Sequence, residues 1–247
     1  MIIAEIGINH LGCVERCKSF INKLVNTNVD GITLQVREPE YYVENTNYKL
    51  EDSDYIELIK LIHSYDKKVG IALADISKID IFESIGVDFY KVIRNDITNR
   101  TLIKKLIETN KKLIISTGTS SDSDIENFTK YIDTEHWNIS TDITLNHTQL
   151  SNDVEDCNLR AIEILYNKYP FNVSYGNHCS NHIVLYMSLC YKPSDILFYI
   201  KGDDGEIYPD DKHAILLSDV VDVTNNIINL SKAIGSGIKK QMKIKIK

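Results

Sequence analysis

Short apolar runs rich in β-branched residues alternate along this chain with longer stretches in which apolar residues recur at helical spacing. Eight of the short runs have the length of buried strands: Ile2–Ile6, Gly31–Gln35, Val69–Leu73, Phe89–Val92, Leu113–Ser116, Ile143–His147, Asn172–Tyr175 and Asp195–Ile200. The stretches of helical period cover residues 13–27, 52–66, 76–85, 99–109, 121–133, 157–168, 180–191 and 213–234. Repeated strand–helix units of this kind predict a single-domain α/β fold, the (β/α)8 TIM barrel.

The length of 247 residues fits one such barrel. We expect the barrel to cover residues 1–236 and a basic tail, in which lysine recurs, to cover residues 237–247. The longest irregular segments, Arg37–Leu50 and Gly202–Lys212, are predicted to be elaborated loops at the ligand-binding end, since loops of this length are often functional.

The formal net charge of −7 argues against a nucleic-acid-binding protein, because affinity for the phosphate backbone depends on a basic surface. The five cysteines are odd in number and scattered, so no disulfide framework is predicted. The N-terminus leads into an apolar strand without a basic leader, and no apolar run reaches membrane-spanning length. A cytoplasmic protein with no membrane partner is therefore expected.

Polar residues gather where the predicted strands end, which is where a barrel binds its ligand. Lys91 ends one strand and is followed by Arg94 and Asp96, and other strand ends contribute Glu5, Asn9, His10, Gln35, Ser116, Thr117 and His178. Ionisable groups that converge at one mouth indicate a ligand site, because each desolvated charge is costly unless it is paired. The alternative is a structural network in which Glu5, Lys91, Arg94 and Asp96 neutralise one another.

Ser116-Thr117-Gly118 ends a strand and leads toward a helix start. Its hydroxyls and free backbone N–H groups could hold a phosphate or carboxylate, with Lys91 and Arg94 nearby. The alternative is that these residues only cap the following helix. His178, in a later loop, is open to three interpretations: a hydrogen-bonded structural group, a general base or a metal ligand.

Five motifs follow one another along nearly the whole chain: Ala4–His10, Asp88–Asn99, Leu113–Gly118, Asp156–Ile162 and Ser174–His178. With these motifs the sequence resembles the sialic acid synthase family, whose members condense phosphoenolpyruvate with an amino sugar. The resemblance implies a (β/α)8 barrel that binds phosphoenolpyruvate and a divalent metal, Mn²⁺ or Mg²⁺, beside an open-chain N-acyl mannosamine. It also implies a homodimer.

The resemblance assigns roles by position. Lys91, Ser116 and Asn158 would contact phosphoenolpyruvate, and His178 matches the family's first metal-binding histidine. The catalytic set that it implies, together with the strand-end analysis, is Glu5, Lys91, Asp96 and His178. The substrate-binding set is Asn9, His10, Gln35, Arg94, Ser116, Thr117, Asn158 and Arg160.

Several positions depart from the family pattern at this same site. Thr33 stands where the family has a phosphate-binding lysine, and Ile71–Ala74 lacks the hydroxyl of the family's third strand end. Arg94 and Asn95 replace a serine and a glycine. The positive charge that the family has at position 33 is therefore absent, and Arg94 adds a positive charge at a different position.

The metal site departs too. Tyr199 stands where the family has its second metal-binding histidine, and His178 alone would hold a metal weakly, because two or more strong protein ligands are normally needed. The sequence also ends near the end of the barrel, ahead of the antifreeze-like domain that bacterial members of the family usually carry.

Three classes of function remain open. The first is a phosphoenolpyruvate-dependent C–C bond-forming synthase of sugar acid biosynthesis, in which Arg94 supplies the charge lost at Thr33. The second is an enzyme with metal-independent chemistry on another anionic sugar or keto acid. The third is a non-catalytic barrel that binds a sugar or serves as an accessory subunit. The substitutions at the site favour the last two classes, and the retained residues favour the first two. We predict a sialic acid synthase-like enzyme, with altered or lost activity as the alternative.

Overall fold

The computed structural model describes residues 1–135, 142–239 and 241, without the side chain of Asn95. Parallel strands form a closed barrel, because β1 is hydrogen-bonded to both β2 and β8. The barrel strands are β1 (Ile2–Gly7), β2 (Gly31–Val36), β3 (Lys68–Leu73), β4 (Phe89–Val92), β5 (Lys112–Ser116), β6 (Ile143–His147), β7 (Asn172–Asn177) and β8 (Ile196–Lys201). The predicted single-domain TIM barrel is confirmed, with each strand end within two residues of its predicted place.

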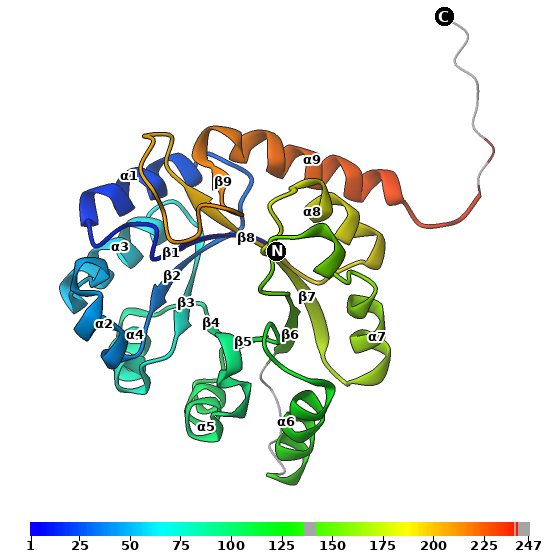
Figure 1. Ribbon diagram of the computed structural model, residues 1–247, viewed down its shortest axis with the longest axis horizontal. Coiled ribbons are helices and arrows are strands. Elements are labelled where there is room, and N and C mark those ends of the chain that lie inside the picture. Colours follow the sequence, from blue (N-terminus) through cyan, green and yellow to red (C-terminus); the bar gives the residue numbers. More distant parts are fainter. Residues whose placement is uncertain (136–141, 240, 242–247) are drawn as a thin grey trace, which may run out of the picture.

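Helices surround the barrel (Figure 1). They are α1 (Val14–Leu24), α2 (Pro39–Glu44), α3 (Asp52–His63), α4 (Ile79–Ile85), α5 (Arg100–Glu108), α6 (Asp122–Thr134), α7 (Ala161–Lys168), α8 (Ile183–Met187) and α9 (Val220–Ile234). Apolar residues at helical spacing form the inner face of each longer helix; in α5 they are Leu102, Ile103, Leu106 and Ile107. At the start of α6, Ser121 and Asp124 form a reciprocal capping box, as the run of serine and aspartate predicts.

Two predictions of local structure were wrong. The helix expected over residues 213–234 begins only at Val220, because Ile215–Leu216 forms a short strand, β9, beside the end of β8. The segment Arg37–Leu50, expected to be irregular, contains α2, with Pro39 in the first turn, where its missing N–H costs nothing. Whether a segment pairs as a strand or forms a short helix within a loop depends on contacts with residues distant in sequence. Helical periodicity does not reveal those contacts.

The strand register decides which side chains point into the barrel, since alternate residues of a strand face the same side. A small apolar cluster fills the middle of the interior: Ile3, Phe89, Ile114 and Leu197. Gly70 leaves room for it, because a Cβ there would come within 2.1 Å of the Phe89 ring. The next layer of inward-facing side chains lies two residues further along the same four strands, toward their carboxyl ends. It consists of Glu5, Lys91, Ser116 and Tyr199.

In the described part of the chain, no helix is both long and apolar enough to cross a membrane. Of the predicted basic tail, only residues 237–239 and 241 are described, so the rest of that prediction lies outside the described residues.

Candidate functional site

A hollow of about 310 Å³ opens at the carboxyl ends of the strands, and we refer to it as the mouth. Five residues predicted for the site line it: Gln35, Lys91, Arg94, Ser116 and His178. The remaining lining residues are Ile8, Arg37, Tyr41, Ile93, Leu150, Tyr199, Pro209, Asp210 and His213. Strand ends far apart in the sequence therefore meet at one polar site, as expected for a parallel barrel.

Lys91 and Glu5 form a buried ion pair at the floor of the mouth. The Lys91 Nζ lies 2.5 Å from Glu5 Oε1 and 2.7 Å from Oε2, and both side chains are at most 5% exposed. The Lys91 ammonium also lies 5.6 Å from the centre of the Tyr199 ring. An ion pair held this deeply is costly to break, because either partner alone would be an uncompensated buried charge.

Two arginines add positive charge. Arg37 is buried, donates to both oxygens of the Glu38 carboxylate at 3.0 and 2.7 Å, and stacks 3.9 Å from the centre of the Tyr41 ring. Arg94 is exposed, and its backbone φ of 50° is unusual for a residue with a side chain. Among the described residues, the Arg94 guanidinium has no hydrogen-bond or ion-pair partner, so it is free to meet a ligand.

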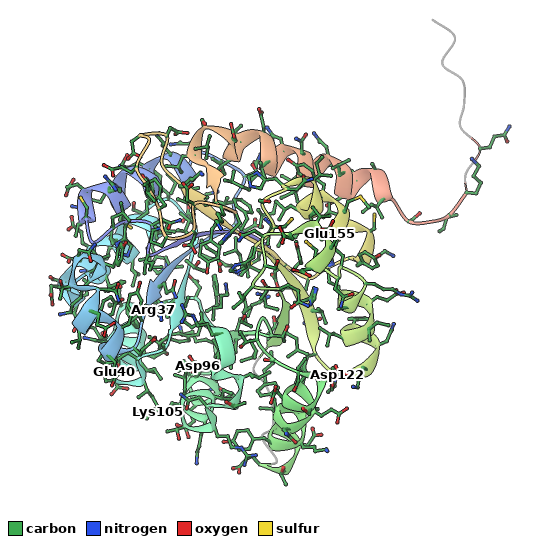
Figure 2. All side chains as sticks on the ribbon, viewed as in Figure 1. Arg37, Glu40, Asp96, Lys105, Asp122 and Glu155 are labelled. Carbon is green, nitrogen blue, oxygen red and sulfur yellow. The ribbon has the colours of Figure 1, made fainter. Side chains whose placement is uncertain are left out.

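Asp96 lies beside these arginines rather than in the lining of the mouth. It is half-buried in a short 3-10 turn, Arg94–Thr98, and Figure 2 shows it close to α5. Burial and the negative charge of Glu38 raise the pKa of Asp96, while Arg37 and Arg94 oppose that rise. The predicted catalytic residue Asp96 is therefore not among the residues that line the mouth.

Asp210 is a site residue that the sequence prediction missed. It enters the mouth from the loop after β8, where its backbone N–H donates to Asn9 Oδ1 at 3.3 Å. Gly7, at φ +57°, allows this approach, since a Cβ there would lie 3.4 Å from Asp210 Oδ2 and 2.8 Å from the Tyr199 ring. Burial and the charge of Glu5 raise the pKa of Asp210 to about 7. A carboxyl group in this state can donate or accept a proton at neutral pH.

Asp210→Asn is expected to stabilise the protein by about 2 kcal/mol at pH 8, and hardly at all at pH 4. Folding raises the pKa of Asp210, so at a pH below its unfolded pKa the carboxyl group is protonated in both states and costs no stability. The cost grows as the pH rises above the unfolded pKa, and it levels off once the pH passes about 7. The expected gain in stability is smaller than the full pKa shift would give, because Asp210 is 20% exposed and solvent weakens its interactions. Urea unfolding at both pH values measures the difference. Asp211→Asn, which loses only a half-exposed pair with Lys201, is the control, and a gain that does not depend on pH would contradict the prediction.

Three aromatic rings occupy the place where the resemblance implies a metal. The His178 and His213 rings stack at 4.4 Å and 30°, and both meet the edge of the Tyr199 ring. Burial, mainly, lowers the pKa of His178 well below its usual value and that of His213 to about 4. Burial, with the charges of Glu5 and Asp210, holds the pKa of Tyr199 well above its usual value, so the phenol stays protonated.

These residues do not fit the implied metal. Stacked imidazoles cannot both direct a nitrogen lone pair at one ion, and a protonated phenol is a poor ligand for Mn²⁺ or Mg²⁺. Among the described residues there is also no group of three or more His, Cys, Asp or Glu side chains with the spacing of a metal site.

Asn9 and His10 lie behind the mouth rather than in its lining. Both are fully buried. Asn9 donates to the Ile200 carbonyl at 2.7 Å and accepts from Asp210, so it ties the end of β8 to the Asp210 loop. His10 Nδ1 accepts from the Gly12 N–H at 3.0 Å, and burial lowers the pKa of His10 to about 4. The structure therefore places neither of these two predicted substrate-binding residues in the lining of the mouth.

Thr117, Asn158 and Arg160 are not part of the mouth either. They line a separate hollow between the starts of α6 and α7. The sequence places Asn158 and Arg160 just before a helix, but it does not show that this helix start faces outward from the barrel wall. Their predicted contact with a substrate in the mouth is therefore not supported by their positions.

The chain is similar to known sugar acid synthases in sequence. The model described as the NeuB family matches residues 20–239. An N,N'-diacetyllegionaminic acid synthase of Campylobacter jejuni is 25% identical in an alignment 267 positions long, which covers 98% of this chain and 80% of that protein. An N-acetylneuraminate-9-phosphate synthase of Drosophila melanogaster is 27% identical in an alignment 198 positions long, which covers 71% of this chain and 52% of that protein.

The fold is similar to that of solved members. The structure of an N-acetylneuraminic acid synthetase from Leptospira borgpetersenii, in complex with citrate, superposes with a TM-score of 0.88 at 21% identity, over 98% of this chain and 87% of that one. That likeness shows the barrel fold, and the match over residues 20–239 shows the family. This chain belongs to the NeuB family, as the resemblance of its motifs predicted.

Proposed function

We propose that the chain is a sugar acid synthase that joins phosphoenolpyruvate to an N-acyl amino sugar at the mouth. The observation that carries the proposal is the set of three cations, Arg37, Lys91 and Arg94, around one hollow that the Asp210 carboxyl group also lines, with Glu5 bonded to Lys91 beneath it. Phosphoenolpyruvate bears a phosphate and a carboxylate, and cations beside a donor-lined pocket are the usual way to hold both.

In this proposal the cations divide the work of binding. Arg94, exposed and unpaired among the described residues, meets the phosphate, because a guanidinium donates to two oxygens at once. Arg37 and Lys91 keep protein partners, Glu38 and Glu5, and supply a background of positive charge. Ser116, 5% exposed, offers a hydroxyl donor beside them.

The chemistry follows from the carboxyl groups. The C3 carbon of phosphoenolpyruvate bonds to the aldehyde carbon of the sugar, and the Asp210 carboxyl donates a proton to the aldehyde oxygen. Water then adds to C2 and passes one proton to the Asp210 carboxylate. The new C2–OH group gives its other proton to the leaving phosphate as the C2=O bond forms and the C2–O bond to phosphate breaks, so hydrogen phosphate and the keto sugar acid are released. Asp210 suits the first step because its pKa of about 7 leaves a protonated fraction at neutral pH. No step depends on a metal.

A titration with Mn²⁺ or Mg²⁺ is therefore expected to give weak binding or none. The reason is the ring arrangement of His178, His213 and Tyr199, which offers no convergent set of ligand atoms. Isothermal titration calorimetry measures this directly. Tight binding that disappears in His178→Ala would show that another set of ligands forms in solution, and it would overturn the metal-free assignment.

The test of the proposed function is turnover. The protein is incubated with phosphoenolpyruvate and N-acetylmannosamine, and released phosphate and the new sugar acid are measured together. Glu5→Gln is expected to lose turnover, whereas Lys60→Gln, an exposed lysine on α3, is expected to keep it. Release of phosphate without a new C–C bond would favour different chemistry on a keto acid. Binding without turnover would favour a non-catalytic barrel.

A further inference from the structure

A second hollow, of about 300 Å³, lies outside the barrel wall between the starts of α6 and α7. Its lining residues are Thr117, Ser120, Asp122, Ile125, His147, Thr148, Gln149, Asn158, Arg160, Ala161, Ile164 and Leu165. It shares no lining residue with the mouth. Thr148 and Leu150 pack on Gly118 between the two, within 2.9 and 3.2 Å of where its Cβ would stand. Figure 2 shows Asp122, of the second hollow, well apart from Arg37 of the mouth.

Two hydroxyl groups in this hollow lack hydrogen-bond partners among the described residues. They are Thr148 Oγ1, on a residue only 2% exposed, and Ser120 Oγ, which is also shielded from solvent. A buried hydroxyl without a partner destabilises the folded state, so native proteins rarely leave one in this state. Two of them in one hollow point to a ligand that accepts hydrogen bonds.

Positive charge stands at the same place. Arg160 is exposed, and its guanidinium has no ion-pair or hydrogen-bond partner in the described ranges 1–135, 142–239 and 241. It is also the residue before α7, which has no side-chain cap, so the positive end of that helix adds to its charge. The one carboxylate of the lining, Asp122, is held by Lys168 at 3.1 Å.

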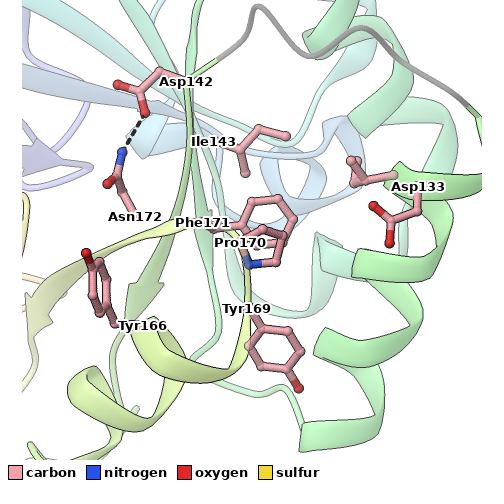
Figure 3. A pocket seen from close by; sticks show the side chains of 9 residues that line it. Asp133, Asp142, Ile143, Tyr166, Tyr169, Pro170, Phe171 and Asn172 are labelled. Atoms are coloured by element: carbon pink, nitrogen blue, oxygen red, sulfur yellow. Dashed lines mark hydrogen bonds between the residues drawn. The ribbon is translucent and has the colours of Figure 1, made fainter.

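Another hollow on the molecule, of about 690 Å³, differs in kind. It lies near the amino-terminal ends of β6 and β7, is lined by Tyr166, Tyr169, Pro170 and Phe171, and has its amide Asn172 already bonded to Asp142 (Figure 3). It offers neither a free cation nor a buried unpartnered hydroxyl among the residues that line it.

We propose that the hollow between α6 and α7 binds the phosphate group of a small molecule, at a site separate from the mouth. A phosphate has enough oxygens to accept from the Arg160 guanidinium, from Thr148 Oγ1 and Ser120 Oγ, and from the N–H groups before α7. A phosphate also carries more negative charge than a carboxylate, so the Arg160 guanidinium and the positive end of α7 favour it.

The test is a titration of the full ¹⁵N-labelled chain with inorganic phosphate at constant ionic strength, followed by NMR. The amide signals of Ser120, Leu159 and Arg160 are expected to shift and to saturate. Arg160→Gln should weaken this binding tenfold or more, the effect of losing a charged hydrogen bond. Thr148→Val, which removes the buried hydroxyl and keeps the shape, should weaken it severalfold. Arg94→Gln, in the mouth, should leave these signals unchanged.

Lys105→Gln, on the exposed side of α5, is the matched control for loss of one positive charge. Shifts that do not saturate, or that weaken equally in Lys105→Gln and Arg160→Gln, would show general attraction to charge and overturn the proposal. The result is independent of the proposed synthase activity, because the mouth reports through different amides and through Arg94.

Discussion

Lys91→Met is expected to lower the free energy of unfolding by about 3–5 kcal/mol, the usual effect of removing one partner of a buried ion pair. The substitution leaves the Glu5 carboxylate, 3% exposed, without the ammonium that it now contacts through both oxygens. Chemical denaturation at pH 7 measures the loss. Turnover should disappear as well, because the floor of the mouth loses its cation.

The double variant Glu5→Leu with Lys91→Met is the informative control. It removes both charges, and apolar pairs often replace buried ion pairs without a loss of stability, so most of the 3–5 kcal/mol should return. Lys23→Met, which breaks the exposed pair with Asp203, should cost less than about 1 kcal/mol. If Lys91→Met lowered the free energy of unfolding no more than Lys23→Met does, the Glu5–Lys91 pair would not be important for the stability of the barrel.

Arg94→Ala is expected to weaken the binding of phosphoenolpyruvate by about 2–3 kcal/mol, or roughly 30- to 150-fold. Arg94 is the mouth cation that has no protein partner among the described residues, so its charge is available to the ligand. Its backbone at φ 50° carries strain that an alanine would share, so the loss reports on the guanidinium. Calorimetry or competition binding measures the affinity.

Arg100→Ala is the control, since that arginine stacks on Tyr131 outside the mouth and should not change affinity. Thr33→Lys restores the family residue, but Thr33 is 1% exposed and pairs in register with Glu5. A second ammonium there would crowd the Glu5–Lys91 pair, so we expect lower stability and little gain in binding. Unchanged affinity in Arg94→Ala, together with binding and turnover created by Thr33→Lys, would make Arg94 a structural partner of Asp96 instead.

The fold could be predicted from the sequence because apolar residues recur at different spacings in strands and in helices. Every barrel strand came from a short apolar run, and its end could be placed because a polar or glycine-containing segment follows. The helices were predicted less well where tertiary contacts determine the local structure. At Ile215–Leu216, for example, pairing with the end of β8 makes the segment a strand. Local pattern cannot report that contact.

The candidate site was only partly accessible. Lys91, Ser116 and His178 were found because each follows a strand, and strand ends of a parallel barrel meet. Asp210 was missed as a site residue because it lies in a long loop without periodicity, whose path over the mouth is fixed by Asn9 and Gly7. Arg37 directly follows β2, but nothing in the sequence indicated that it pairs with Glu38.

The sequence by itself therefore determined the barrel, the end at which ligands bind and most of the charged groups there, because alternation along strands is a local property. Only the tertiary structure decided three further points. It stacked His178 on His213 beside Tyr199, and it brought Asp210 close to Glu5. It also carried Asn158 and Arg160 to the outer side of the wall. Such outcomes depend on how loops of different strands pack against one another, and loop packing is set by contacts between residues far apart in the chain.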